Sequence, residues 1–142
     1  MTSFIHRMQF TIEWGQCDPA GIVFNARFFT FFDTSTWLLF KAALGVPPEQ
    51  LAPTFDIIGI PLVGAGARYL KAVRFGDLVD MESHVAEFRR SSFSVQHRLF
   101  VKGELAVEGD ETRVWAGRDT TKPSGMTARA IPADVIARFG AA

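Results

Sequence analysis

The chain has 142 residues, 48% of them hydrophobic, which is enough to form one sizeable core, so we expect a single domain over residues 1–142. Lysine plus arginine and aspartate plus glutamate number 15 each, and this neutral balance argues against nucleic acid or an anionic membrane as a partner. The single cysteine, Cys17, excludes an internal disulfide and a multi-cysteine metal site, and we expect no metal ion.

The N-terminus and the apolar segments predict a soluble, cytoplasmic protein with no membrane association. Residues 1–10 include His6 and Arg7 and lack the apolar stretch of about 7 to 15 residues that a secretory signal requires. The apolar residues 28–44 are interrupted by Asp33, Lys41 and other polar side chains, which does not suit a bilayer span.

The first third of the chain predicts a strand, a loop and a long helix. Residues 8–14 alternate apolar and polar side chains, as in a strand with one buried face. Residues 15–21 contain two glycines and an Asp-Pro pair, which favour a shaped loop. Residues 25–45 then form one helix of about five turns, with Asn25 as a possible N-cap and Gly45 as its stop. This helix is apolar around much of its circumference, so we expect other elements to wrap it.

Four strands are predicted after a loop or short helix near residues 49–55, at residues 61–73, 78–88, 93–102 and 105–117. The joints at residues 76–77, 90–92 and 103–104 are too short for crossover helices, so we expect successive strands to pair as antiparallel hairpins. Residues 120–125 are expected to be loose, and residues 132–139 to form a short helix. This order predicts an α+β fold of the hot-dog type, in which a five-stranded antiparallel sheet is wrapped around a long central helix.

The loop before the predicted helix carries a recognisable motif. Asp18-Pro19-Ala20-Gly21 lies within the sequence WGQCDPAGIVF at residues 14–24. In this position it resembles the loop of the hot-dog acyl-CoA thioesterases of the 4-hydroxybenzoyl-CoA thioesterase family. Residues 32–33, 59–61, 87–93 and 110–115 are also similar, so the resemblance covers most of residues 8–118.

The resemblance implies hydrolysis of an aromatic, hydroxybenzoyl-like acyl-CoA, with no cofactor besides the CoA of the substrate. It implies that Asp18 is the catalytic carboxylate and that the backbone amide of Asn25 polarises the thioester carbonyl. Such a reaction needs a nucleophile or base and a donor for the oxyanion, and the start of a helix offers unpaired N–H groups. Asp18 could attack the carbonyl to form an anhydride or activate water, and the sequence leaves both routes open.

Two other interpretations exist at this loop. An aspartate before proline commonly forms an Asx turn or a cap, which would make Asp18 structural. Cys17 could be the nucleophile, but the sequence marks none of the three histidines as its base, so we expect a small packed residue.

Polar residues for substrate binding are predicted at a turn and on the helix. Arg89 and Arg90 would bind the phosphates of CoA, since guanidinium groups present paired donors; an ordinary solvated turn is the alternative. Asp33 would accept a hydrogen bond from a ring hydroxyl in the acyl pocket. The alternative for Asp33 is a buried carboxylate bonded to Arg68, Arg74 or a backbone amide.

Phe24, Phe28 and Ile60 complete the predicted acyl pocket. Phe24 and Phe28 recur with Phe32 at every fourth position, so we expect one stripe that serves as core and pocket wall. Ile60 stands where family members can carry a hydroxyl residue, which favours a less polar aromatic group or a medium-length acyl chain. Asn25 and Ser91 also depart from the family pattern, which has Tyr and a basic residue there.

Other functions are a non-catalytic acyl-CoA binding or sensor module, a short- or medium-chain acyl-CoA thioesterase, and an enoyl thioester hydratase. The hydratases of this fold commonly have a histidine five residues after the aspartate, where this chain has Val23. The family typically places its active sites between two protomers, which implies a homodimer or a homotetramer.

Overall fold

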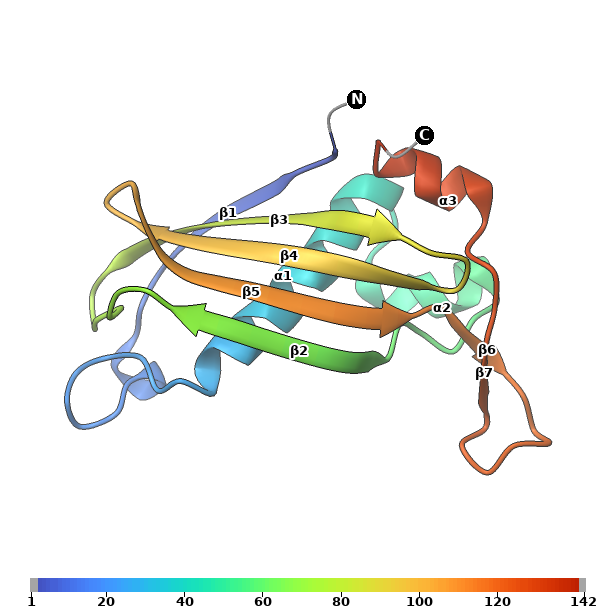
Figure 1. Cartoon of the computed structure of the whole chain (residues 1–142), viewed down its shortest axis with the longest axis horizontal. Coiled ribbons are helices and arrows are strands. Elements are labelled where there is room, and N and C mark those ends of the chain that lie inside the picture. The colour runs from blue at the N-terminus through green and yellow to red at the C-terminus, as the bar shows by residue number, and fades with distance from the viewer. Residues whose placement is uncertain (1–2, 141–142) are drawn as a thin grey trace.

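A curved antiparallel sheet surrounds one long helix in the computed structural model, which describes residues 3–140 (Figure 1). The helix is α1 (Arg27–Leu44), and the sheet has the strand order β1-β3-β4-β5-β2. The strands are β1 (His6–Thr11), β2 (Leu62–Tyr69), β3 (Leu78–Phe88), β4 (Ser92–Val101) and β5 (Glu104–Val114). The predicted α+β class, with a five-stranded sheet wrapped around the helix, is confirmed.

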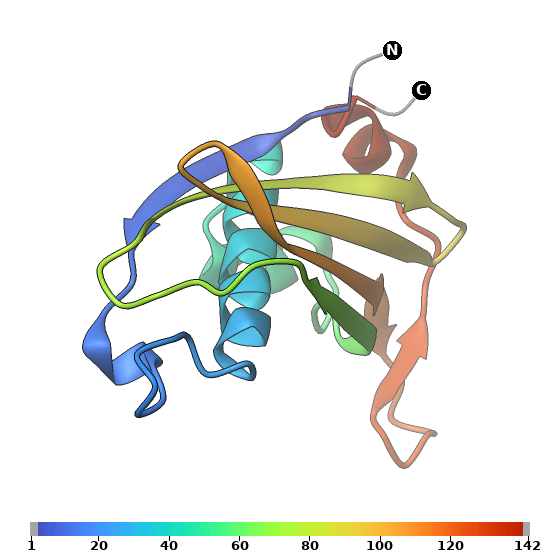
Figure 2. The same ribbon diagram turned by 60° about the vertical axis from the view of Figure 1, so that its left-hand side comes forward.

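The smaller elements cover the ends of this unit. They are the 3-10 turn η1 (Trp14–Gln16), the helices α2 (Pro48–Phe55) and α3 (Ala133–Arg138), and the short strands β6 (Ala116–Arg118) and β7 (Met126–Ala128). Figure 2 shows β6 and β7 as a hairpin that extends away from the main sheet, with residues 120–125 at its tip. The predicted strand at residues 105–117 is therefore two strands, because the chain leaves the main sheet at Trp115.

One predicted strand pairing is wrong. β2 does not form a hairpin with β3: it pairs with β5, while β3 pairs with β1 and β4. The connection, residues 70–77, runs past the ends of β5 and β4 to reach β3, and it finishes in a turn in which the Asp77 N–H donates to the Arg74 carbonyl at 3.0 Å. Three strand spacings amount to about 14 Å, and eight extended residues reach up to about 26 Å. The joint is too short for a helix, yet it is long enough for this crossing.

The ends of α1 match the sequence prediction only at the C-terminus. Gly45 has a φ of 71° and its N–H donates to the carbonyl of Lys41, as expected for a C-terminal stop. At the N-terminus, Ala26 occupies the cap position and the predicted cap Asn25 lies one residue earlier, in a turn. Phe24 precedes the helix and is exposed, so the expected stripe is reduced to the buried residues Phe28 and Phe32.

The core consists of two clusters along α1. One gathers around the second half of α1 with α2 and α3, and includes Phe40, Phe93 and Trp115. The other lies around the first half, where Phe28 and Phe32 pack against the sheet. One face of α1 remains exposed, at Arg27, Thr30, Asp33, Thr34 and Lys41, so the helix is not covered on all sides as expected. No helix among the described residues is long and apolar enough to cross a membrane.

Candidate active site

The loop that carries the Asp-Pro-Ala-Gly motif is a small closed hairpin. Cys17 pairs with Val23, and the Asp18 N–H donates to the Ile22 carbonyl at 3.0 Å. Gly21, with a φ of 79°, makes the tight return that this hairpin requires. The segment after β2 fixes the hairpin, because Val23 donates to the Val73 carbonyl at 2.8 Å. The loop is thus held in place before any ligand binds.

The carboxylate of Asp18 is half-buried and only partly engaged. Its Oδ1 accepts a hydrogen bond from the Ala20 N–H at 2.8 Å, which is an Asx-type turn across Pro19. Within residues 3–140, no group donates to Oδ2. The structural role considered for Asp18 is therefore present, but it occupies one oxygen and leaves the other available for chemistry.

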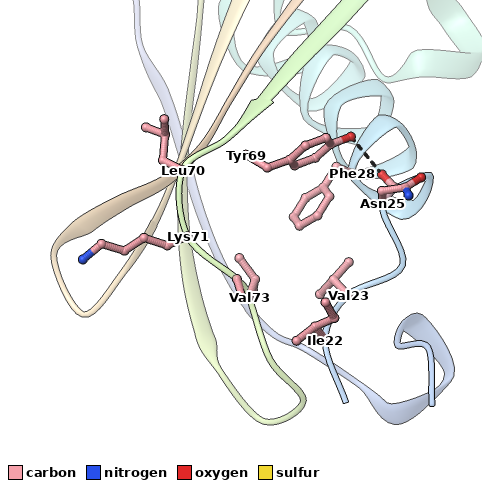
Figure 3. A pocket seen from close by; sticks show the side chains of 9 residues that line it. Ile22, Val23, Asn25, Phe28, Tyr69, Leu70, Lys71 and Val73 are labelled. Atoms are coloured by element: carbon pink, nitrogen blue, oxygen red, sulfur yellow. Dashed lines mark hydrogen bonds between the residues drawn. The ribbon is translucent and has the colours of Figure 1, made fainter. Parts of the chain in front are cut away.

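A cleft of about 230 Å³ lies between this loop, the start of α1 and the end of β2 (Figure 3). Ile22, Asn25 and Phe28 line one side, and Tyr69 closes it with its ring 5.4 Å from that of Phe28. The Tyr69 hydroxyl donates to the Asn25 carbonyl at 3.4 Å. Asp18 does not line the cleft, but its backbone N–H bonds to Ile22, which does.

The backbone amide of Asn25 has no acceptor among the described residues. Asn25 follows Phe24 in a β-turn that leads into α1, closed by a 2.8 Å hydrogen bond from the Arg27 N–H to the Phe24 carbonyl. An unpaired N–H at the start of a helix, where the helix dipole is positive, is suited to a developing negative charge.

A second groove, of about 380 Å³, lies between the middle of α1 and the segment that leads into β2. Asp33 is on its wall, and Oδ1 of Asp33 accepts a hydrogen bond from Nη2 of Arg113 at 2.8 Å. The expected alternative partners, Arg68 and Arg74, are not used. The side chain of Ile60 is buried, with 2% exposed, while its carbonyl accepts from Nη1 of Arg113 at 3.1 Å.

Sequence reasoning missed Arg113 and the buried network behind it. Glu111 accepts from Nε of Arg113 at 3.3 Å, from Nη2 at 2.9 Å and from the hydroxyl of Thr36. The signal is two charges at alternate positions of a strand, on the face that should be apolar. Burial alone would raise the pKa of Glu111, but hydrogen bonds from His97, Arg113 and Thr36 and the charge of Arg113 lower that pKa to about 2.

His97 continues the network into the core. Its Nε2 lies 3.2 Å from Glu111, and its Nδ1 lies 2.6 Å from the hydroxyl of Ser83, which in turn contacts Ser35 at 2.6 Å. An ionised Glu111 can only accept, so Nε2 of His97 donates a hydrogen bond to it. The ring of Phe32 stacks on this imidazole, with the ring centroids 4.9 Å apart.

Arg89 and Arg90 lie away from the motif loop. They are at the turn after β3, whereas the loop contacts the chain just before β3, and the eleven residues of that strand span about 35 Å. Arg89 already donates to Glu87, Ser92 and Ser94, at 2.8 to 2.9 Å. The side chain of Arg90 is exposed and has no hydrogen bond within residues 3–140. Within a single protomer, the arginine pair and Asp18 are therefore far apart.

The described residues offer little support for cysteine catalysis or for a metal site. Cys17 is half-buried and its thiol donates to the Glu13 carbonyl at 3.6 Å. Among residues 3–140, no group of three His, Cys, Asp or Glu side chains lies close enough to hold a metal ion.

Comparison with known proteins identifies similar proteins that agree with one another in family. Residues 12–139 match the model of the thioesterase-like superfamily. The chain is 33% identical over 135 residues to 4-hydroxybenzoyl-CoA thioesterase from Pseudomonas sp. (strain CBS-3), covering 91% of this chain and 93% of that one. The solved structure of this enzyme matches with a TM-score of 0.83 at 30% identity, over 96% of this chain and 99% of that one. A gentisyl-coenzyme A thioesterase matches with a TM-score of 0.79 at 26% identity, over 94% and 99%.

Proposed function

The chain belongs to the thioesterase-like superfamily and is an acyl-CoA thioesterase of the hot-dog fold, and from this premise we propose that its substrate is an aromatic, hydroxybenzoyl-like acyl-CoA. The products would be the free acid and CoA. Two relatives support the aromatic acyl group, since their names specify 4-hydroxybenzoyl-CoA and gentisyl-CoA. The apolar grooves beside Phe28 and Trp37 have the character that an aromatic ring requires.

Asp18 is the catalytic carboxylate in this proposal. The observation that supports this role is the geometry of the motif loop, which is held by backbone hydrogen bonds. The loop presents the Asp18 carboxylate with one oxygen unused, and the chain after it leads to the unpaired backbone amide of Asn25. The thioester carbonyl oxygen would accept from the Asn25 N–H, which stabilises the oxyanion as the carbonyl carbon becomes tetrahedral. Oδ2 of Asp18 would either deprotonate a water molecule that attacks that carbon, or attack the carbon itself to form an anhydride that water then hydrolyses. In both routes the C–S bond breaks and the CoA thiolate leaves.

A second copy of the chain would complete the site. The cleft beside Asn25 adjoins the Tyr69 end of β2, and the groove beside Asp33 adjoins the Leu62 end. β2 is an edge strand, and its Leu62, Val63 and Tyr69 are exposed by 49%, 63% and 49%. Antiparallel pairing of two β2 strands would place the Tyr69 end of one protomer beside the Leu62 end of the other. We therefore propose a homodimer, or a tetramer built from it.

Arg90 is the stronger of the two candidates for binding the CoA phosphates. It is exposed without a hydrogen-bond partner in the described chain, whereas Arg89 is held by three neighbours at the turn. A guanidinium group with unused donors can bind a phosphate without first breaking internal bonds. The location of the turn implies that this contact, too, involves the dimer.

The substrate assignment is tested by free-thiol release from benzoyl-CoA, 4-hydroxybenzoyl-CoA, phenylacetyl-CoA, butyryl-CoA and octanoyl-CoA. We expect the highest kcat/KM with an aromatic acyl group. Higher values for butyryl or octanoyl would instead identify a short- or medium-chain thioesterase. Binding of these thioesters without release of thiol would identify a binding module and contradict the proposed activity.

A further inference from the structure

We propose that Arg113 is a positioning residue which makes the enzyme select acyl groups that carry a hydrogen-bond donor, because it fixes the carboxylate of Asp33 at the wall of the groove beside α1. The inference rests on the proposed thioesterase function and concerns the choice between aromatic substrates. Arg113 touches neither the motif loop nor the cleft beside Asn25. It lies in the lining of the groove beside α1, but its side chain is 4% exposed against 55% for Asp33, so its effect would pass through Asp33.

Arg113 links the two walls of this groove. Its Nη2 donates to Asp33 on α1 at 2.8 Å, and its Nη1 donates to the carbonyl of Ile60 on the opposite wall at 3.1 Å. The side chain of Arg113 is 4% exposed, while that of Asp33 is 55% exposed. One buried cation thus sets both the position of an accessible carboxylate and the separation of the walls.

Glu111 allows Asp33 to keep its negative character toward the groove. Both oxygens of Glu111 accept from Arg113, and hydrogen bonds from Thr36 and His97 keep Glu111 ionised. The positive charge of Arg113 is therefore already balanced inside the protein. The three charged side chains of Asp33, Arg113 and Glu111 together have a net charge of −1, and the accessible member is Asp33.

The surroundings of Asp33 make a donor on the substrate important. The groove is otherwise apolar, with Trp37, Ile58, Leu62 and Met126 among its lining. Oδ2 of Asp33 receives no hydrogen bond within residues 3–140. An aromatic ring without a donor displaces the water that is hydrogen-bonded to Oδ2 and leaves this oxygen without a hydrogen bond. A ring hydroxyl instead donates a hydrogen bond to Oδ2. A ring with a carboxylate would be repelled by the same charge.

The test is the ratio of kcat/KM for 4-hydroxybenzoyl-CoA to kcat/KM for benzoyl-CoA, measured for wild type, Arg113→Lys, Asp33→Ala and the double variant. Lysine keeps the charge but has no planar pair of donors to hold Asp33 and Ile60 together. We expect wild type to favour the hydroxylated substrate by about 10- to 100-fold, and Arg113→Lys to lower that ratio by about tenfold. In the Asp33→Ala background, Arg113→Lys should change the ratio by less than about twofold.

The control is Arg98→Lys, at an exposed arginine on β4, for which the ratio should match wild type. If Arg113→Lys does not fold, the double variant Glu111→Gln/Arg113→Met replaces it, since removing a buried ion pair together is tolerated better than removing one partner. An equal effect of Arg113→Lys with and without Asp33 would overturn the inference, as would an unchanged ratio in Arg113→Lys or in Asp33→Ala.

Failure of the inference is distinct from failure of the proposed function. Rapid hydrolysis of both substrates by wild type, with a ratio near one, would contradict selection by Asp33 and leave the aromatic thioesterase assignment intact. Hydrolysis of neither substrate would overturn both.

Discussion

The ring of Phe32 lies directly against Gly109, in the space that a side chain at position 109 would occupy. The ring also stacks on the imidazole of His97, whose plane is tilted by only 8° from that of Phe32. Because Gly109 has no Cβ, α1 can approach the sheet closely at this point, and the Phe32 ring can lie flat against His97.

Gly109→Ala should therefore reduce the free energy of unfolding by about 1 to 3 kcal/mol, because the added methyl group overlaps the Phe32 ring and forces α1 or the ring to move. Urea denaturation followed by circular dichroism measures this loss. The matched control is Gly15→Ala, where nothing lies within 4 Å of the added carbon. Equal stability of the two variants would show that the Phe32 contact is not tight.

Glu111 should make stability depend on acid. Its pKa is about 2 in the folded chain against an ordinary value of 4.5, so its stabilising contribution is present above pH 4.5 and is lost as the pH falls toward 2. Between pH 5 and pH 2, the free energy of unfolding of wild type should fall by about 3 kcal/mol more than that of Glu111→Gln.

Glu108→Gln, on the same strand outside the buried network, is the control for that series and should keep the pH dependence of wild type. The assignment fails if Glu111→Gln and wild type lose stability in parallel as the solution is acidified.

The role of Asn25 is predicted to reside in its backbone. Asn25→Ala keeps the N–H group, so kcat should stay within about threefold of wild type. Asn25→Pro removes the N–H at the second position of a β-turn, where proline is readily accommodated, and should lower kcat by about 100-fold or more. Circular dichroism checks that the proline variant folds. Full activity in Asn25→Pro would contradict the role of the backbone N–H, and an equally large loss in Asn25→Ala and Asn25→Pro would assign the role to the side chain.

Arg90→Ala should raise KM for a CoA thioester by about tenfold with little change in kcat, since the contact with phosphate is equally strong in the ground and transition states. Arg89→Ala should raise KM less and mainly loosen the turn, because Arg89 bonds to Glu87, Ser92 and Ser94. Steady-state kinetics with Arg98→Ala as an exposed control decides the matter. An unchanged KM in Arg90→Ala would exclude this phosphate contact.

Much of the fold follows from local sequence patterns. Period-two alternation identifies the strands, and Gly45 marks the end of α1 because glycine adopts the left-handed conformation at low cost. The pairing of β2 could not be predicted in the same way. A short joint excludes a crossover helix, but which strand lies beside β2 depends on how the whole sheet curves around α1.

The candidate site shows the same difference between local features, which the sequence predicts, and long-range contacts, which it does not. The motif loop is contiguous in sequence, so its turn at Gly21 and the Asx-type turn of Asp18 follow from local patterns. The role of Arg113 could not be predicted from the sequence, because its partner Asp33 is 80 residues away. A charged residue on the buried face of a strand does not indicate which residue it will pair with. The prediction of Asn25 as a cap failed because the turn closed by Arg27 starts the helix later.

The most direct test of the central claim is thiol release from 4-hydroxybenzoyl-CoA by wild type and Asp18→Asn. Asparagine preserves the shape of the side chain and its turn-forming oxygen but removes the charge that acts as nucleophile or base. If Asp18 is the catalytic carboxylate, kcat should fall by about 100-fold or more, while Asp110→Asn, at an exposed aspartate of β5, keeps the wild-type rate. Hydrolysis by Asp18→Asn at the wild-type rate would contradict the mechanism and leave Asp18 with its role in the turn alone.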